Sequence, residues 1–350
     1  MNRTRSCLQF YLAAILAFGF LGGPVNSKDT GKQRNKRCEG TAGAQVGGSS
    51  GPRVTFDTGS LRGSFRFFDE KGQREGPGKK DNWTDFPGAA ECVYKPLGVP
   101  LVNETPPNSL FLPEWLLRPK GPRDGILWRQ AFFVMPERIP HGVRVRYPDE
   151  ALAQQGLRCT FDYRAIGDML LLDGYMEATR SQTDFEFFFA SYIPNRLNPT
   201  YAPAKHNSEI TWKLIPNRVE YWKSAYFICS SDETRRWRRD GRMSDASDLG
   251  DWSLVYDADW PFAAPILVAV EESSGLAAIQ FVDDHCTVLA GQYHPHDTAH
   301  DFAWGWHSLS PGERVHTRAA FWITQLQGSQ QERMVQVYKK YLRWRNSWAK

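Results

Sequence analysis

The sequence predicts a mainly β, antiparallel protein with one helix at its C-terminal end. Short apolar and aromatic runs alternate with turn residues from residue 54 onward, which favours strands. A helical period is sustained only near the C-terminus, apart from a short stretch around residues 232–242. The 13 Trp, 13 Tyr and 21 Phe beside 22 Pro and 29 Gly also favour strands and turns over a helical bundle.

Length and composition exclude two broad classes of protein. With 350 residues, 41% of them apolar and 13% aromatic, the chain is too apolar to be disordered. Its formal net charge of +4 is small and arises from mixed signs, so the whole chain does not indicate nucleic-acid binding. We therefore expect a globular protein that binds no nucleic acid.

The first 27 residues resemble a secretory signal peptide in their charge and hydrophobicity. Arg3 and Arg5 form a basic start, Leu8 to Leu21 is apolar apart from Gln9, and residues 25–27 offer a cleavage site. The apolar run of roughly 14 residues is shorter than the ~20 that a membrane-spanning helix needs. We predict a secreted or periplasmic protein without a membrane span, with an uncleaved anchor as the alternative.

One β domain is predicted at residues 54–327, after a flexible tether at residues 28–53 that is rich in Lys, Gly, Ser and Gln. Three consecutive strand candidates between residues 157 and 191 are the clearest, because Gly167-Asp168 and Ser181-Gln182 separate them as in a meander. Further candidates are residues 54–56, 64–68, 126–134, 143–147, 209–214, 219–229, 266–270, 277–282, 287–289 and 315–324.

The last segment, residues 328–350, is predicted to be a helix packed on the domain. Ser329 and Glu332 have the spacing of a capping box, in which each side chain bonds the other residue's backbone amide. Apolar residues follow at helical spacing. We expect the basic residues of this helix to face water or a partner, namely Lys339, Lys340, Arg343 and Arg345.

The cysteines that remain after the leader are widely spaced and form no CxxC pair, which argues against zinc and redox motifs. One or two disulfides are compatible with an oxidising compartment. We expect most of these residues to be buried as small apolar side chains. They are Cys38, Cys92, Cys159, Cys229 and Cys286.

The densest group of chemically active residues lies at 294–307, where four of the eight histidines accompany two aspartates and two tryptophans. Imidazole and carboxylate groups move protons, and indole faces stack on sugars. The spacing matches no standard zinc motif, so we predict no metal and no cofactor. We predict a sugar-binding loop; the alternative is a surface loop whose tryptophans close the core. The candidates are His294 as a catalytic group and His296, Asp297, Trp304, Trp306 and His307 as substrate contacts.

A second candidate segment, residues 192–207, follows a strand that is expected to be buried. Tyr192 and His206 are candidate catalytic groups, and Asn195 and Arg196 are candidate substrate contacts, because a loop at a strand end can reach ligand hydroxyls or a carboxylate. The alternative is a connection rich in Pro and Asn that satisfies its own backbone.

Five arginines surround Trp237 in the segment 235–242. Arginine pairs with carboxylates and sulfates through two parallel hydrogen bonds, so an acidic polysaccharide is a compatible partner. The alternative is a solvated helix face with local salt bridges.

The segment 307–313 with the strand after it resembles the end of a galactose-mutarotase-like, or aldose 1-epimerase-like, β-supersandwich. The strands at 157–192, which end in a Ser-Tyr pair, are also similar to that superfamily. The resemblance implies an antiparallel β-supersandwich over about residues 54–327. It places Ala190 and Ala290 where the epimerases carry a histidine and a glutamate, which implies that epimerase activity is absent.

Taken together, these features predict a secreted or periplasmic carbohydrate-recognising protein, either a binder or one that acts on a poly- or oligosaccharide as a lyase or isomerase does. This hypothesis requires the two candidate segments to meet in one groove beside an exposed indole. The alternative is a non-catalytic envelope or surface protein that docks a partner through the Arg-rich segment and the C-terminal helix. The sequence indicates no oligomeric state.

Overall fold

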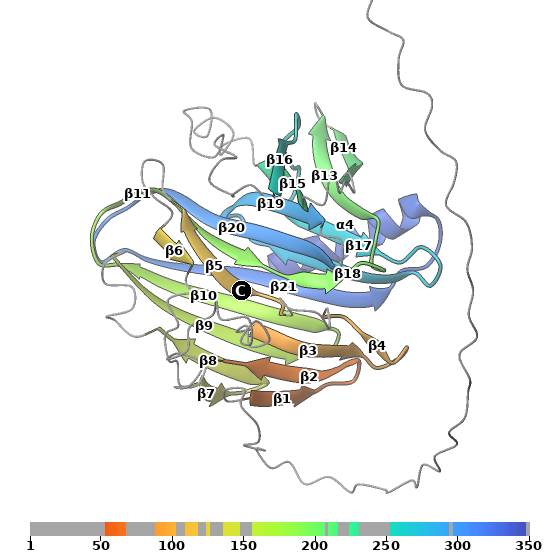
Figure 1. Cartoon of the computed structure of the whole chain (residues 1–350), viewed down its shortest axis with the longest axis horizontal. Helices are drawn as coiled ribbons and strands as arrows, with labels where there is room; N and C mark the ends of the chain where they lie inside the picture. Colours follow the sequence, from red (N-terminus) through yellow and green to blue (C-terminus); the bar gives the residue numbers. More distant parts are fainter. Residues whose placement is uncertain are drawn as a thin grey trace, which may run out of the picture. The chain divides into compact units, whose positions relative to one another are not determined.

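The computed structural model describes residues 53–67, 88–102, 109–117, 124–126, 136–147, 156–206, 209–215, 224–230, 253–293 and 297–347. All of them belong to one compact unit, residues 44–350. They form three β-sheets and one helix (Figure 1). All strand pairs are antiparallel except β15 with β16, so the predicted fold class is confirmed for this part of the chain. The leader and the Arg-rich segment lie outside the described residues.

The largest sheet has nine strands, and its order shows which residues can meet across its surface. In spatial order its strands are β14 (Glu209–Ile215), β13 (Thr200–His206), β17 (Ile266–Val270), β18 (Leu276–Val282), β21 (Arg314–Gln325), β10 (Met169–Ala178), β9 (Leu157–Ile166), β8 (Gly142–Arg146) and β7 (Pro136–Ile139).

The second sheet is eight-stranded and faces the first across the main core. Its path is β16 (Ser253–Asp257), β15 (Ser224–Ser230), β19 (Cys286–Tyr293), β20 (Asp297–Leu309), β11 (Gln182–Ala190), β5 (Leu112–Leu117) and β6 (Asp124–Ile126), and β12 (Tyr192–Pro194) pairs with β20 beside that path. A four-stranded sheet completes the domain with β1 (Arg53–Asp57), β2 (Leu61–Arg66), β3 (Gly88–Tyr94) and β4 (Val99–Pro100).

The predicted meander is correct for its first two strands and wrong for the third. β9 and β10 pair through a turn at Gly167, which has the left-handed φ of 60° that glycine accepts at low cost. β11 instead crosses to the eight-stranded sheet and pairs with β20. From there Phe187 and Phe189 reach the core opposite β9, which buries both rings on the apolar side of each sheet.

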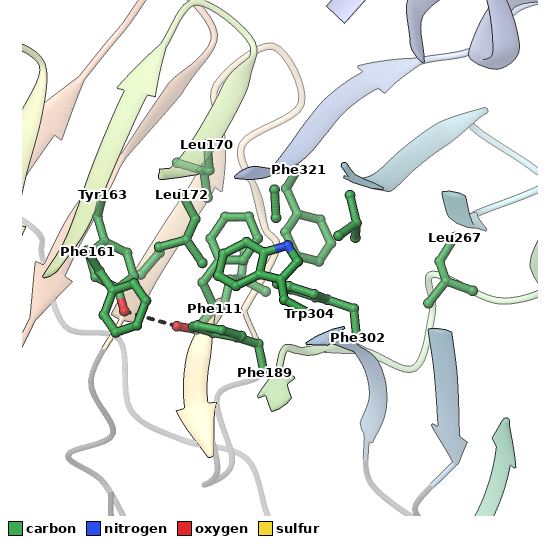
Figure 2. Packing of buried hydrophobic residues seen from close by; sticks show 14 of the residues in the cluster. Phe111, Phe161, Tyr163, Leu170, Leu172, Phe189, Leu267, Phe302, Trp304 and Phe321 are labelled. Carbon is green, nitrogen blue, oxygen red and sulfur yellow. Dashed lines mark hydrogen bonds between the residues drawn. The ribbon is translucent and has the colours of Figure 1, made fainter. Parts of the chain in front are cut away.

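Aromatic rings join the two large sheets (Figure 2). Phe161 on β9 contacts Phe187 and Phe189 on β11 with ring centres 5.4 and 5.5 Å apart. Trp304 on β20 packs edge-on against Phe189 at 4.8 Å. Gly174 on β10 gives the indole room, since a Cβ there would lie 2.9 Å from the Trp304 ring.

The C-terminal helix, α4 (Gln330–Asn346), begins with the predicted capping box at Ser329 and Glu332. It buries Met334, Val337 and Tyr341 against the nine-stranded sheet, where Tyr341 lies 5.6 Å from the ring of Phe281. The apolar stripe therefore covers one part of that sheet's outer surface.

One of the basic residues on α4, Lys340, differs from the prediction that it faces water or a partner. Lys340 stands 4.9 Å over the Trp322 ring, and Arg345 pairs with Asp284 at 2.6 Å. Lys340 thus packs on its own domain, whereas Lys339, Arg343 and Arg345 are exposed as expected. Four cysteines, at positions 92, 159, 229 and 286, are buried, which confirms the prediction of buried cysteines for the described part of the chain.

Candidate functional site: a cationic sheet face

A polar surface lies on the outer side of β8, β9, β10 and β21. Successive side chains of a strand point to opposite faces, so Phe161 and Tyr163 enter the core while Asp162 and Arg164 point outward. The helix α4 covers the apolar residues of this face around Phe281. The polar residues on β8, β9, β10 and β21 lie next to the area that the helix covers.

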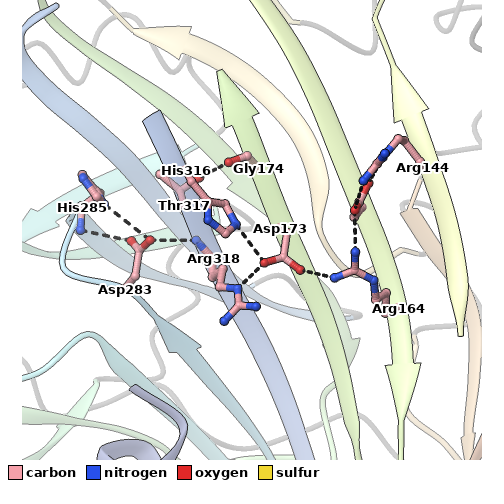
Figure 3. Close-up of polar contacts among 10 residues, drawn as sticks. Arg144, Arg164, Asp173, Gly174, Asp283, His285, His316, Thr317 and Arg318 are labelled. Atoms are coloured by element: carbon pink, nitrogen blue, oxygen red, sulfur yellow. Dashed lines mark hydrogen bonds and ion pairs between the residues drawn. The ribbon is translucent and has the colours of Figure 1, made fainter. Parts of the chain in front are cut away.

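Two buried aspartates organise this surface (Figure 3). Arg144 binds both oxygens of Asp162, with Nε at 2.6 Å and Nη2 at 2.8 Å. Arg164 bridges the pair, since its Nη2 lies 2.6 Å from Asp162 and its Nη1 lies 2.6 Å from Asp173. Asp173 also accepts a hydrogen bond from Arg318 Nε. The result is a continuous ion-pair chain across four strands.

The aspartates lie beneath the arginines. The Asp162 and Asp173 side chains are 0% and 3% exposed, whereas the side chains of Arg144, Arg164 and Arg318 are 24% to 31% exposed. Burial acts to raise the pKa of Asp173, but hydrogen bonds from His316 and Arg318 and the charge of Arg164 outweigh it and lower that pKa. Solvent therefore meets the cationic side of the chain of ion pairs.

A stacked pair of rings adjoins these arginines. Tyr175 on β10 and His316 on β21 are direct neighbours in the sheet, and their rings lie 4.5 Å apart at an angle of 6°. Tyr175 is 38% exposed, and His316 Nε2 lies 3.1 Å from Asp173. Burial, and then the charges of Asp173 and Asp162, raise the pKa of Tyr175, so its hydroxyl remains a hydrogen-bond donor at neutral pH.

A second charged group lies further along the same strands. Glu177 on β10 accepts hydrogen bonds from Arg314 at 2.8 Å and from Arg158 at 3.1 Å. The hydrogen bond from Arg314 is the main cause that lowers the pKa of Glu177. Arg314 and Arg158 are largely exposed, with side-chain exposures of 79% and 53%.

At the other end of the surface, Asp283 and His285 fix the backbone next to Arg318. Asp283 Oδ2 accepts a hydrogen bond of 2.7 Å from the Arg318 amide, and Asp283 Oδ1 accepts one of 3.1 Å from the His285 amide (Figure 3). Burial raises the pKa of Asp283. The hydrogen bond between the side chains of His285 and Asp283 raises the pKa of His285. A pocket of about 240 Å³ opens beside Asp173 and Arg318, and its lining includes Leu171 and Trp344.

The strand after residue 190 lies beside the start of β20, whereas the groove that the carbohydrate hypothesis requires around His294 falls on residues outside those described. β12 pairs with the start of β20, with Tyr192 opposite Ala299, and Thr298 Oγ1 donates a 2.8 Å hydrogen bond to Asn195 Oδ1. Tyr192 is buried at 7% exposure, whereas Arg196 is exposed. His294 and His296 lie outside the described residues, as do the side chains of His206 and Asp297.

The prediction of an exposed indole beside those segments is wrong. Residues 297–309 form the strand β20 rather than a loop, and Trp304 and Trp306 lie on its core side at 0% and 8% exposure. Trp306 stacks on Phe185 with ring centres 5.1 Å apart. The alternative interpretation, in which the tryptophans close the core, is the correct one. His307 is exposed.

Two alanines and one histidine at or near β20 are buried, namely Ala190, Ala290 and His300. Ala190 and Ala290, to which the sequence resemblance assigns the epimerase catalytic positions, are both fully buried. His300 is fully buried with Nε2 3.1 Å from Thr200 Oγ1, and burial lowers its pKa to about 3. His300 is therefore neutral at physiological pH.

The sequence prediction missed the cationic face of β8, β9, β10 and β21. Its signal was present in the meander, where charged residues occupy alternate positions: Asp162 and Arg164 on one strand, and Asp173 and Glu177 on the next. Charges at period two within a strand mark one face of a sheet. The described residues contain no helix with the length and apolar character needed to cross a membrane. They also bring together no three His, Cys, Asp or Glu side chains that could hold a metal ion.

No family model matches the chain, and no curated protein matches its sequence. In three dimensions the chain is similar over most of its length to several solved structures, among them galactose mutarotase-like proteins. The Slr1438 protein of Synechocystis has 10% identity and a TM-score of 0.49, covering 80% of this chain and 99% of that one. A galactose mutarotase-like protein of Lactobacillus casei has 10% identity and a TM-score of 0.44, covering 78% and 100%.

A galactose mutarotase related enzyme of Lactobacillus acidophilus has 8% identity and a TM-score of 0.44, covering 78% of this chain and 97% of that one. Identities and TM-scores this low say nothing about activity or substrate.

Proposed function

We propose that this protein is a secreted or periplasmic carbohydrate-recognising protein that binds its ligand on the outer face of β8, β9, β10 and β21. The observation that carries the proposal is the partly exposed, stacked pair of Tyr175 and His316 among fixed guanidinium groups. The signal-like leader at residues 1–27 supports the compartment.

This face presents the two kinds of group that bind sugars, an aromatic ring and hydrogen-bond donors. A pyranose ring offers C–H groups to an aromatic side chain and hydroxyls to hydrogen-bonding partners. Tyr175 supplies a ring and a protonated hydroxyl, while Arg144 and Arg164 supply N–H donors that buried carboxylates hold in place. Donors fixed in advance lose little side-chain entropy when a ligand binds.

Among the described residues, binding is better supported than turnover. A lyase or isomerase needs a base near the reacting carbon, and the raised pKa of Tyr175 makes its phenolate scarce at neutral pH. Asp173 is buried, and Arg164 and Arg318 beside it help to lower its pKa and keep it ionised. This carboxylate cannot readily exchange a proton with a sugar.

The partner-docking hypothesis finds less support in the C-terminal helix. Lys340 and Arg345 contact Trp322 and Asp284 of the same domain, so they anchor the helix. The exposed Lys339, Arg343 and Arg345 make a small surface for a stable interface.

A glycan panel tests the proposal with the full-length chain. We expect Tyr175→Ala to weaken binding of the glycans that the protein recognises by roughly fivefold, because the ring contact is lost. Tyr175→Phe keeps the ring and removes only the hydroxyl, so it should lose less affinity than Tyr175→Ala does. Glycan binding that Tyr175→Ala leaves unchanged would place the site elsewhere, and the absence of any bound glycan would refute the function.

A further inference from the structure

We infer that the ligand of this face is a linear anionic glycan, carboxylated or sulfated, that lies along β10 with its acid groups at two cationic rows. This inference rests on the proposed function and specifies its ligand class. The first cationic row comprises Arg144, Arg164 and Arg318 with their buried aspartates, and the second comprises Arg158, Arg314 and Glu177.

Strand register places the two rows on either side of the aromatic pair. Asp173 is opposite Arg318 on β21 and Asp162 on β9, whereas Glu177 is opposite Arg314 and Arg158 on the same two strands. Tyr175 lies midway between Asp173 and Glu177 along β10 and points to the same face. A ligand that stacks on Tyr175 therefore has positive charge on both sides.

Each row carries more positive than negative charge. In the first row three arginines face two aspartates, and in the second two arginines face one glutamate. The acids of the first row are also the buried members, so solvent meets mainly guanidinium groups. An arriving carboxylate or sulfate meets a favourable field, and a neutral sugar gains nothing from it.

The arginines of the first row retain donors for a ligand. A guanidinium has five N–H groups. Arg144 donates from Nε and Nη2, and Arg164 donates from Nη1 and Nη2. Both side chains stay about a quarter exposed, so their remaining N–H groups can bond an anion in the geometry that Arg shares with carboxylates and sulfates.

The spacing of the rows indicates a chain of sugars rather than one. Asp173 and Glu177 are four residues apart on β10, and a strand rises about 3.3 Å per residue, so the rows lie about 13 Å apart. That distance exceeds the length of one pyranose ring. A single acidic sugar reaches one row, whereas a linear acidic oligosaccharide reaches both and gains from both contacts.

The second row offers the safest variants for a test. Arg158 and Arg314 are more than half exposed and both bond Glu177 at the surface, so their replacement should leave the fold intact. The test variant is R158Q with R314Q. Its matched control is R62Q with K213Q, which also removes two exposed positive charges but on β2 and β14.

Four probes separate the ligand class from the function. The full-length chain is titrated calorimetrically with oligogalacturonate, a neutral maltooligosaccharide of equal length, sulfated dextran and inorganic polyphosphate, each at low and at physiological salt. We expect the acidic glycans to bind and to weaken as salt rises, because the contacts are electrostatic. R158Q with R314Q should lose roughly tenfold in affinity for them, and R62Q with K213Q should lose less than about twofold.

The possible failures are distinguishable. Equal binding of neutral and acidic glycans, unchanged in R158Q with R314Q, would overturn the anionic ligand class and leave carbohydrate recognition standing. Carbohydrate recognition would be overturned by a different result. In that result polyphosphate binds as tightly as the acidic glycans, and Tyr175→Ala changes the affinity for neither class of ligand. No binding of any probe would overturn both.

Discussion

Two segments of this chain combine aromatic and charged residues, and they end in opposite environments. Residues 294–307 hold the higher density of His, Asp and Trp, yet Trp304 and Trp306 close the core. Residues 158–177 look less conspicuous, yet their alternate side chains form an exposed cationic face. In a β protein, the position within the strand period decides which residues can meet a ligand, and local density does not.

The largest expected effect is a difference in unfolding free energy between a substitution in residues 294–307 and one in residues 158–177. Trp304→Ala should lower the free energy of unfolding by about 4 kcal/mol, because it removes a fully buried ring and leaves a cavity. Tyr175→Ala should change it by less than about 1 kcal/mol, because that ring is partly exposed. Chemical denaturation measures both values. Equal losses in the two variants would mean that the assignment of Trp304 to the core is wrong.

The second contrast compares the buried His300 with the exposed His316. Burial lowers the pKa of His300 to about 3, so between about pH 6.5 and pH 3 the unfolded chain binds a proton that the folded chain does not. The free energy of unfolding should therefore fall as the pH falls through that window, by about 2 kcal/mol between pH 7 and pH 5 from this residue.

Histidine-to-glutamine variants isolate that contribution in denaturation curves recorded across the same pH range. His300→Gln should flatten the dependence, and His316→Gln should leave most of it in place. If His300→Gln retains the full slope, the histidine is not held neutral and β20 is less enclosed than the structure shows.

A smaller effect on stability is expected from the buried carboxylates that hold the arginines, Asp162 and Asp173. Asp173→Asn should cost about 1 to 2 kcal/mol of unfolding free energy at neutral pH, because Arg164 and Arg318 lose a charged acceptor. The folded pKa of Asp173 is lowered, so its contribution is present above the unfolded pKa of about 3.9 and is lost as the pH falls through the folded value.

Wild type and Asp173→Asn should therefore converge in stability once the pH falls below the lowered pKa of Asp173 in the folded chain. Glu177→Gln, in the exposed second row, is the control and should have the smaller effect at neutral pH. The interpretation fails if Glu177→Gln is the more destabilising of the two, or if the difference between wild type and Asp173→Asn does not depend on pH.

Much of the fold could be predicted from residue patterns, and less of the site. Hydrophobic alternation located β9 and β10, and the Ser329 and Glu332 spacing located the start of α4, because both signals are local. Alternation alone does not tell which sheet a strand joins, so β11 was expected beside β10 and lies in the other sheet. The site was missed for the same reason: Arg318 and Asp173 are 145 residues apart in sequence and meet only through the pairing of β10 with β21.

Arginine footprinting during ligand binding tests the central claim most directly, because it compares the two regions in one experiment. The full-length chain is labelled with a dicarbonyl reagent with and without oligogalacturonate, and modification is read by mass spectrometry. We predict that the ligand protects Arg158 and Arg314 on the sheet face and leaves Arg196, the exposed arginine after β12, as reactive as before. Protection of Arg196 with Arg158 and Arg314 unchanged would contradict the account and return the site to the segments that meet at β12 and β20.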